Sequence, residues 1–220
     1  DPNFLFYLAN YRPIVDAAIK SMAGTSGRQR VQLDVLQNYH YTCPPLSIQK
    51  AIADTLSCLD AKIEVNNKII ENLEAQAQAI FKNWFIDFEP FQEGEFVESE
   101  LGLIPEGWRV RQLGSSMVIS TKTYKAKVEP ERIVEHYSIP AFDADEYPSF
   151  DLSSTIRSNK YYVPRSSFLV SKLNPRFPRI WHPLHLTNDA VCSTEFIVYV
   201  PKKPEELAFY YHLVKSDRFY

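Results

Sequence analysis

Glycine and cysteine are scarce in this 220-residue chain, which has 6 glycines and the three cysteines Cys43, Cys58 and Cys192. Neither the GxGxxG nor the GxxxxGK[ST] pattern occurs, so the phosphate-binding loops that need these patterns are excluded. An odd number of distant cysteines is typical of reduced thiols in an intracellular protein and not of a disulfide framework. No signal peptide and no apolar run of membrane-spanning length is present. The chain begins without Met, inside helix-like sequence, so we expect a fragment.

Acidic residues are also absent from one long stretch, the 37 positions between Asp151 and Asp189. The net charge of -3 argues on its own against a nucleic-acid partner, but the charges are segregated. The acid-free stretch carries six cations, interleaved with aromatic residues: Arg157, Lys160, Arg165, Lys172, Arg176 and Arg179. Eleven acidic residues against four basic ones lie between Ser47 and Glu100. The acid-free stretch therefore predicts either a solvated basic face or a surface for phosphates and base edges.

What the chain does have is a long heptad pattern in its middle. Two series of residues seven apart, offset by four, give the alternating spacing of a coiled-coil seam: Ile52, Leu59, Asn66, Leu73 and Ile80, and Leu56, Ile63, Ile70, Ala77 and Trp84. Ser47 is the expected N-cap, and a helix ending near Phe85 would be about 60 Å long. A lone helix cannot bury so narrow a stripe, and no second segment carries such a pattern. We therefore expect a partner helix from another chain.

The rest of the chain predicts globular regions on both sides of this helix. Two short helices divided at Pro13 should occupy residues 4–22, and a helical turn followed by a strand should occupy residues 33–42. An acidic linker is expected over residues 88–107. Short apolar runs after Trp108 predict the strands of a mixed α/β domain, and a final helix should start at Pro204. The predicted segments are thus 1–45, 46–87, 88–107 and 108–220.

Catalytic patterns are weak. His182 and His185 have a spacing that suits metal ligands, but no further ligand pattern accompanies them. Asp143 and Asp145 read more simply as part of a polar loop than as a catalytic pair, and no nucleophile–histidine arrangement is recognisable. We therefore predict no catalytic residue, no metal site and no enzymatic activity.

Several motifs together resemble a known family. The segment Pro44–Ala53, the helix end Ala79–Phe88, and the run Ile104–Trp108 followed by Leu113-Gly114 occur in the order found in specificity subunits of type I DNA restriction-modification enzymes. Ser171–Pro175 and Ala190–Phe196 resemble motifs inside the target recognition domains of these subunits. Gly24–Arg30 resembles the loop before their conserved helix. The resemblance extends over nearly the whole chain.

This resemblance implies a fold and a role. It implies mixed α+β target recognition domain regions joined by one long coiled-coil helix, here the end of one domain, the helix and most of a second domain. The partners would be double-stranded DNA, modification subunits that use S-adenosylmethionine, and a restriction subunit that uses ATP and Mg. The subunit itself would bind no cofactor. The expected location is the cytoplasm of a prokaryote.

We predict DNA contacts from two loops, at Arg28 and Arg30 in the first and at Lys172, Asn174, Arg176 and Arg179 in the second. The other hypothesis is a coiled-coil interaction module without direct DNA contact. Residues 4–8 also resemble residues 207–211 at an offset of 203, each run following a proline. An antiparallel homodimer along the seam would then rebuild complete domains, with Asn66 near its two-fold axis.

Overall fold

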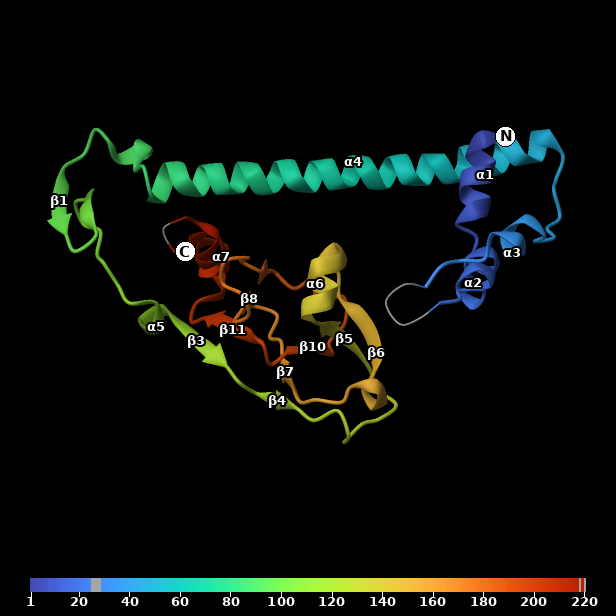
Figure 1. The fold of residues 1–220 in the computed structure, drawn as a ribbon. Coiled ribbons are helices and arrows are strands. Elements are labelled where there is room, and N and C mark those ends of the chain that lie inside the picture. The colour runs from blue at the N-terminus through green and yellow to red at the C-terminus, as the bar shows by residue number, and fades with distance from the viewer. Residues whose placement is uncertain (25–28, 218, 220) are drawn as a thin grey trace. The chain divides into compact units, whose positions relative to one another are not determined.

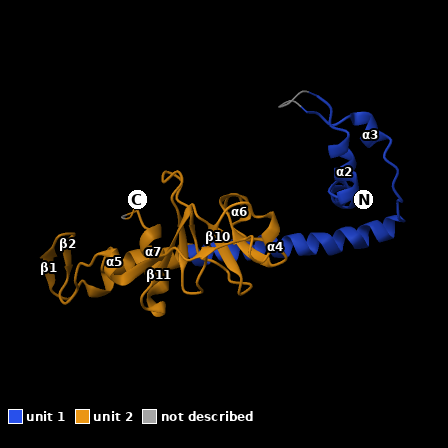
Figure 2. Ribbon diagram, turned by 90° about the horizontal axis from the view of Figure 1, so that it is seen from below, with its two compact units in different colours: residues 1–74 blue, residues 75–220 orange. Residues whose placement is uncertain are grey.

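The computed structural model describes residues 1–24, 29–217 and 219 (Figure 1). Two compact units divide the chain, residues 1–74 and residues 75–220 (Figure 2). The 40-residue helix α4 (Leu46–Phe85) contributes to both. Helices and short sheets occur in the same chain, so the predicted mixed α+β class with one long helix is confirmed.

The first unit is helical. It contains α1 (Pro2–Ala9), α2 (Arg12–Lys20), α3 (Leu33–Gln37) and the first part of α4. The predicted break between the first two helices is confirmed, and Pro13 lies in the first turn of α2, where its missing N–H leaves no hydrogen bond unmade. The Tyr7 hydroxyl donates to Asp60 Oδ2 at 2.6 Å, which ties α1 to α4.

Two local predictions for this unit were wrong. The strand expected before Thr42 is absent from the described residues, since residues 38–45 pair with no other strand. The N-cap of α4 is not Ser47, because the Pro45 carbonyl already accepts hydrogen bonds from Ile48 N at 2.9 Å and Gln49 N at 3.0 Å. The helix consequently begins at Leu46, directly after Pro45. At the start of a helix the N–H that Pro45 lacks would have had no partner within the helix. The predicted end at Phe85 is confirmed.

The second unit begins with the last residues of α4. The acidic segment after it contains a 3₁₀ turn, η1 (Glu89–Phe91), and an antiparallel hairpin of β1 (Phe96–Ser99) and β2 (Gly102–Pro105). An aromatic cluster joins them, since the Phe88 and Phe91 rings lie 5.3 and 5.2 Å from the Trp108 ring. The segment expected to be a linker therefore has its own folded element.

Two sheets form the body of this unit. The four-stranded sheet has the order β3-β11-β8-β9 and is antiparallel. The five-stranded sheet has the order β4-β7-β10-β5-β6, with one parallel pair, β10 with β5. The strands are β3 (Met117–Ser120), β4 (Thr123–Tyr124), β5 (Ile133–Tyr137), β6 (Ser149–Leu152), β7 (Lys160–Tyr162), β8 (Phe168–Ser171), β9 (Ile180–Trp181), β10 (Ala190–Ser193) and β11 (Phe196–Pro201). The strands predicted at 117–119, 167–170 and 196–200 are confirmed.

Short helices complete the unit: α5 (Leu113–Ser116), α6 (Ile139–Asp145), η2 (Ser153–Thr155), η3 (Pro204–Glu206) and α7 (Leu207–Lys215). The final helix predicted from Pro204 is confirmed. α7 packs Tyr210 and Val214 against Phe168 and Ile180 of the four-stranded sheet. Its Phe209 ring lies 4.9 Å from the ring of Phe85 at the end of α4.

The loop predicted around Asp143 and Asp145 was wrong, because both residues lie in α6. The Ser138 hydroxyl caps this helix by accepting from Ala141 N at 3.2 Å, and Pro140 lies in the first turn. A serine followed two residues later by proline is a helix-start signal that could have been recognised.

Candidate nucleic-acid interface

Four of the six predicted DNA-contact residues lie in the segment between β8 and β9, which we call the β8–β9 loop (residues 172–179). Residues 172–178 are all exposed. Ser171 fastens both ends of the loop, since its hydroxyl accepts from Leu173 N at 3.1 Å and its backbone N–H donates to the Arg179 carbonyl at 2.9 Å. The loop therefore projects from a well-defined hairpin base.

The conformation at the tip of the loop depends on Asn174. Its φ of 48° lies in the left-handed region, which asparagine tolerates better than most residues. Its carbonyl accepts a hydrogen bond from Phe177 N at 2.8 Å and closes a turn over Pro175 and Arg176. Phe177 is 68% exposed, an unusual state for so large an apolar ring. The tip thus presents an amide, a guanidinium and an aromatic ring together.

The cations of this loop are in different states. Arg176 is exposed and has no ion pair or hydrogen bond among the described residues. Arg179 is engaged by Asp143 of α6 through two bonds, Nε–Oδ1 at 2.5 Å and Nη2–Oδ2 at 3.0 Å. Hydrogen bonding to Arg179 lowers the pKa of Asp143. Lys172 Nζ donates to the Thr194 carbonyl at 2.6 Å. Arg176 is therefore the cation most available to a ligand.

The other predicted loop lies in the first unit. Arg30 is exposed, and its backbone N–H and C=O pair with Ala23 at 3.0 and 3.1 Å. This bridge closes the base of the loop that contains Arg28. Arg28 itself lies outside the described residues.

The predicted seam is exposed along most of α4. Leu56 and Ala77 are partly buried, and the remaining seam residues are exposed: Ile52, Leu59, Ile63, Asn66, Ile70, Leu73, Ile80 and Trp84. The apolar residues that α4 buries in the described chain, Ala53 and Phe81, each lie next to a seam position. Ile63 and Ile70 are 57% and 58% exposed. Two turns of the seam thus face solvent, with only Asn66 polar among their seam residues, as expected for an unpartnered coiled-coil helix.

A buried carboxylate that the sequence did not reveal organises the loop between β9 and β10. Glu135 on β5 is fully buried and accepts hydrogen bonds from Leu186 N at 3.1 Å and Thr187 N at 2.6 Å. The Tyr137 hydroxyl donates to Glu135 and accepts from the backbone N–H groups of Leu184 and His185. Although burial alone would raise the pKa of Glu135, the hydrogen bonds outweigh it and lower this pKa.

The two histidines with metal-ligand spacing lie on the same loop. His182 is exposed, whereas the Nε2 atom of His185 is buried without a hydrogen-bond partner among the described residues. Burial lowers the pKa of both imidazoles. The part of the chain that the structure describes contains no group of three or more His, Cys, Asp or Glu side chains placed to hold a metal ion. It also contains no helix long and apolar enough to cross a membrane.

Comparison with known proteins identifies the class. Residues 1–75 match the family model described as the type I restriction modification DNA specificity domain. This match coincides almost residue for residue with the first compact unit.

Two curated relatives agree. The chain is 37% identical over 120 residues to the Type I restriction enzyme MjaIX specificity subunit of Methanocaldococcus jannaschii, a match that covers 54% of this chain and 28% of that protein. It is 30% identical over 144 residues to the Type I restriction enzyme HindI specificity subunit of Haemophilus influenzae, with 61% and 30% covered. The family model and both relatives are thus those of type I restriction enzyme specificity subunits, the family that the motifs of this chain resemble. The chain matches about a third or less of the length of each of these relatives.

Among solved structures, the HsdS subunit from Thermoanaerobacter tengcongensis is similar with a TM-score of 0.35 and 15% identity. The match covers 100% of this chain and 56% of that one.

Proposed function

We propose that this chain recognises a DNA sequence and acts as a scaffold within a type I restriction-modification system. The observation that carries the proposal is the match of residues 1–75 to a DNA specificity domain. The exposed tip of the β8–β9 loop supports it, because an unpaired guanidinium and an amide supply the donors and acceptors that base edges require. The proposed contacts are those expected from the sequence: Arg28, Arg30, Lys172, Asn174, Arg176 and Arg179.

The chemistry of the system would belong to other subunits. Modification subunits would dock on the scaffold and methylate DNA with S-adenosylmethionine, and a restriction subunit would use ATP and Mg. The chain itself would select the site and hold these partners near it. Its own residues would bind and orient DNA without forming or breaking a covalent bond.

A binding selection tests this function. The chain together with modification subunits is incubated with a library of random DNA duplexes, and the bound fraction is sequenced at several salt concentrations. We expect enrichment of one split sequence and an affinity that falls with salt, at a slope of about -0.9 per phosphate contact in a double-logarithmic plot. Equal recovery of all sequences at each salt concentration would contradict the proposal.

A flat salt response has a different meaning. It would favour the alternative function, a coiled-coil interaction module without DNA contact. The exposed seam on α4 is the observation that supports this alternative. The two functions are separated because phosphate contacts release counterions, whereas contacts between apolar helices do not.

We also propose that two copies of this chain pair antiparallel through the seam. The exposed stripe needs a partner helix, and the polar Asn66 lies 14 residues from both Ile52 and Ile80. Two Asn66 side chains could then hydrogen-bond near the two-fold axis. The N-terminal region of one copy would lie beside the C-terminal region of the other, and the DNA target would be a split palindrome.

A further inference from the structure

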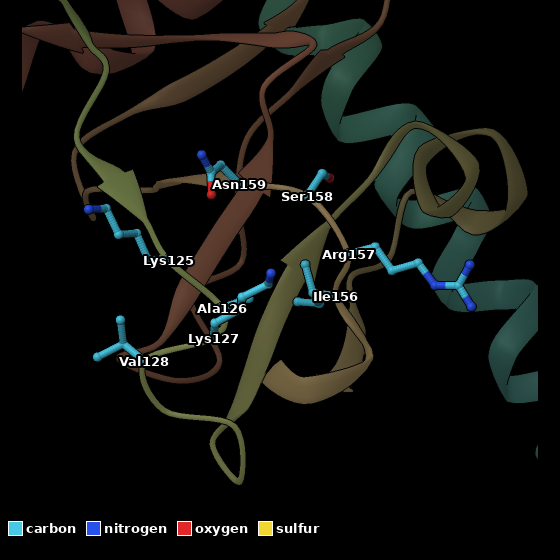
Figure 3. Close-up of a pocket in the computed structure, with 8 residues that line it drawn as sticks. All are labelled: Lys125, Ala126, Lys127, Val128, Ile156, Arg157, Ser158 and Asn159. Atoms are coloured by element: carbon cyan, nitrogen blue, oxygen red, sulfur yellow. The ribbon is translucent and has the colours of Figure 1, made fainter.

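The five-stranded sheet carries a second basic surface, separate from the β8–β9 loop. It is a cleft of about 160 Å³ between residues 125–128, which follow β4, and residues 156–159, which precede β7 (Figure 3). The two walls are about thirty residues apart in the sequence. Three cations lie on them, Lys125, Lys127 and Arg157. We call this surface the β4–β7 cleft.

Buried side chains build the cleft and fix its walls. Tyr124 and Ala126 are buried on one wall and Ile156 on the other, and all three belong to one apolar cluster. The fully buried Ser153 hydroxyl lies 2.8 Å from the Tyr124 hydroxyl and donates to the Ala126 carbonyl at 2.6 Å. Ala126 lies between Lys125 and Lys127 and is buried, and Ile156, which precedes Arg157, is buried too. The three cations themselves are exposed to solvent. The cations are therefore attached to a rigid support.

No carboxylate neutralises these cations. Lys125, Lys127 and Arg157 form no ion pair within the described residues, and each is exposed. The nearby Glu129 carboxylate is paired with Arg132 instead, and Asp151 is bonded to His136 and Ser149. Three positive charges on one small surface repel one another, so their placement favours a bound polyanion.

The arrangement suits a chain of phosphates better than a single anion. Figure 3 shows the Lys125 and Arg157 side chains extending to opposite sides of the cleft. One free phosphate could not contact both, whereas successive phosphates of a nucleic-acid strand could. Ser158 and Asn159 add a hydroxyl and an amide to the lining, groups that commonly bind backbone oxygens.

We propose that the β4–β7 cleft binds the phosphate backbone of the DNA target, through Lys125, Lys127 and Arg157. This inference rests on the proposed function and assigns it a second surface. The cleft supplies affinity that is independent of sequence, and the β8–β9 loop on the other sheet reads the bases. Phosphate contacts fix the position of a protein on the duplex but carry no sequence information themselves.

The test compares two double variants of the full chain with modification subunits present. Lys125→Ala with Lys127→Ala removes two cleft cations. Lys202→Ala with Lys203→Ala removes the same charge from exposed lysines of the same unit that already bind Ser115 and Glu206. For the cleft variant we expect a loss of roughly 30-fold in affinity at 0.15 M salt, and a salt slope shallower by about 0.9 for each lysine. The loss should be equal for target and non-target duplexes.

Three results would overturn the inference. The first is an unchanged salt slope in the cleft variant, and the second is an equal loss in the Lys202/Lys203 control. The third is displacement of the duplex by millimolar inorganic phosphate at constant ionic strength, which would identify a site for a free anion. If the unmodified chain itself shows no preference for any sequence, the proposed function fails instead. Arg157→Ala alters the other wall of the cleft and leaves both lysines in place. This variant should also show a shallower dependence of DNA affinity on salt.

Discussion

Glu135 and Thr187 are joined by two hydrogen bonds, from the Thr187 backbone N–H at 2.6 Å and from its hydroxyl at 3.0 Å, both to Oε2 of Glu135. The residues are 52 positions apart. Their contact connects β5 to the loop between β9 and β10, which lies in the acid-free stretch. A fully buried carboxylate thus fixes the position of this loop.

Replacing this carboxylate by an amide should destabilise the second unit. Each carboxylate oxygen of Glu135 accepts two hydrogen bonds. In Glu135→Gln an NH₂ group replaces one of these oxygens and faces donors, so at least two buried hydrogen bonds are lost. We expect a decrease of about 2–4 kcal/mol in the free energy of unfolding, measured by urea denaturation. The control Glu195→Gln, at an exposed position, should unfold like the unmodified chain. Equal stability of the two variants would contradict the role of Glu135.

Acid should weaken the same contact. The pKa of Glu135 is lower in the folded protein than its ordinary value of 4.5, because hydrogen bonding stabilises the charged form. A group with a lowered pKa contributes stability above its unfolded pKa and loses this contribution as the pH falls through its folded pKa. The free energy of unfolding should therefore drop below about pH 4.5 in the unmodified chain. It should drop less steeply in Glu135→Gln, as followed by denaturation at a series of pH values.

Arg176 should contribute to sequence selection. Its guanidinium is exposed and unpaired within the described chain, so its removal costs no internal contact. Arg176→Ala should reduce the preference for one base position by about 1–3 kcal/mol, the value of a bidentate contact to a base. The measurement is the affinity for the selected duplex and for its single-base variants. A uniform loss for all duplexes would assign Arg176 to a phosphate instead.

Arg179 should behave differently, because Asp143 already accepts two hydrogen bonds from its guanidinium, from Nε and Nη2. Asp143→Ala releases Arg179, and we expect tighter DNA binding and a steeper salt dependence in this variant, by about one phosphate contact. Asp145→Ala removes the same charge two positions further along α6 and should have a smaller effect. If both variants bind DNA alike, the Arg179–Asp143 ion pair does not control access to Arg179.

The seam should control assembly. Ile63→Asp combined with Ile70→Asp places charges in the middle of the proposed helix pair, where they cannot be solvated, and should dissociate the dimer. Light scattering at micromolar concentration should then change from twice the chain mass to about 25.5 kDa. The incomplete recognition domains at the two ends of the chain should also fold poorly.

Val65→Asp is the matched control for this change. Val65 is 54% exposed but lies off the seam, so the dimer should persist. A mass near 25.5 kDa for the unmodified chain would contradict the pairing. A structure with parallel helices would contradict its direction.

The long helix could be predicted from the sequence because its signal is local and repeated. Apolar residues recur at helical spacing between Ile52 and Trp84, and each turn of a helix is stabilised by bonds four residues apart. The strands around Phe168 and Phe196 were found in the same way, from short apolar runs between turn residues. The start of α4 was misplaced because Ser47 and Pro45 both signal a helix start, and only the backbone bonds distinguish them.

The candidate interface could be predicted only in part. The absence of acidic residues directed attention to this stretch, and the β8–β9 loop within it is exposed. Composition could not separate Arg176 from Arg179, because the partner of Arg179 lies 36 residues away on α6. It also missed Lys125 and Lys127, which lie outside the stretch between Asp151 and Asp189.

By itself the sequence determined the class of fold and the extent of the long helix, since these depend on local periodicity, and its motifs in a fixed order pointed to the family. The tertiary structure alone decided which charged groups are available. Tertiary packing brings Glu135 to Thr187, Asp143 to Arg179, and Ser153 to Tyr124 and Ala126. Each contact joins residues from distant parts of the chain, and a carboxylate or hydroxyl acts most strongly on another group at hydrogen-bonding distance.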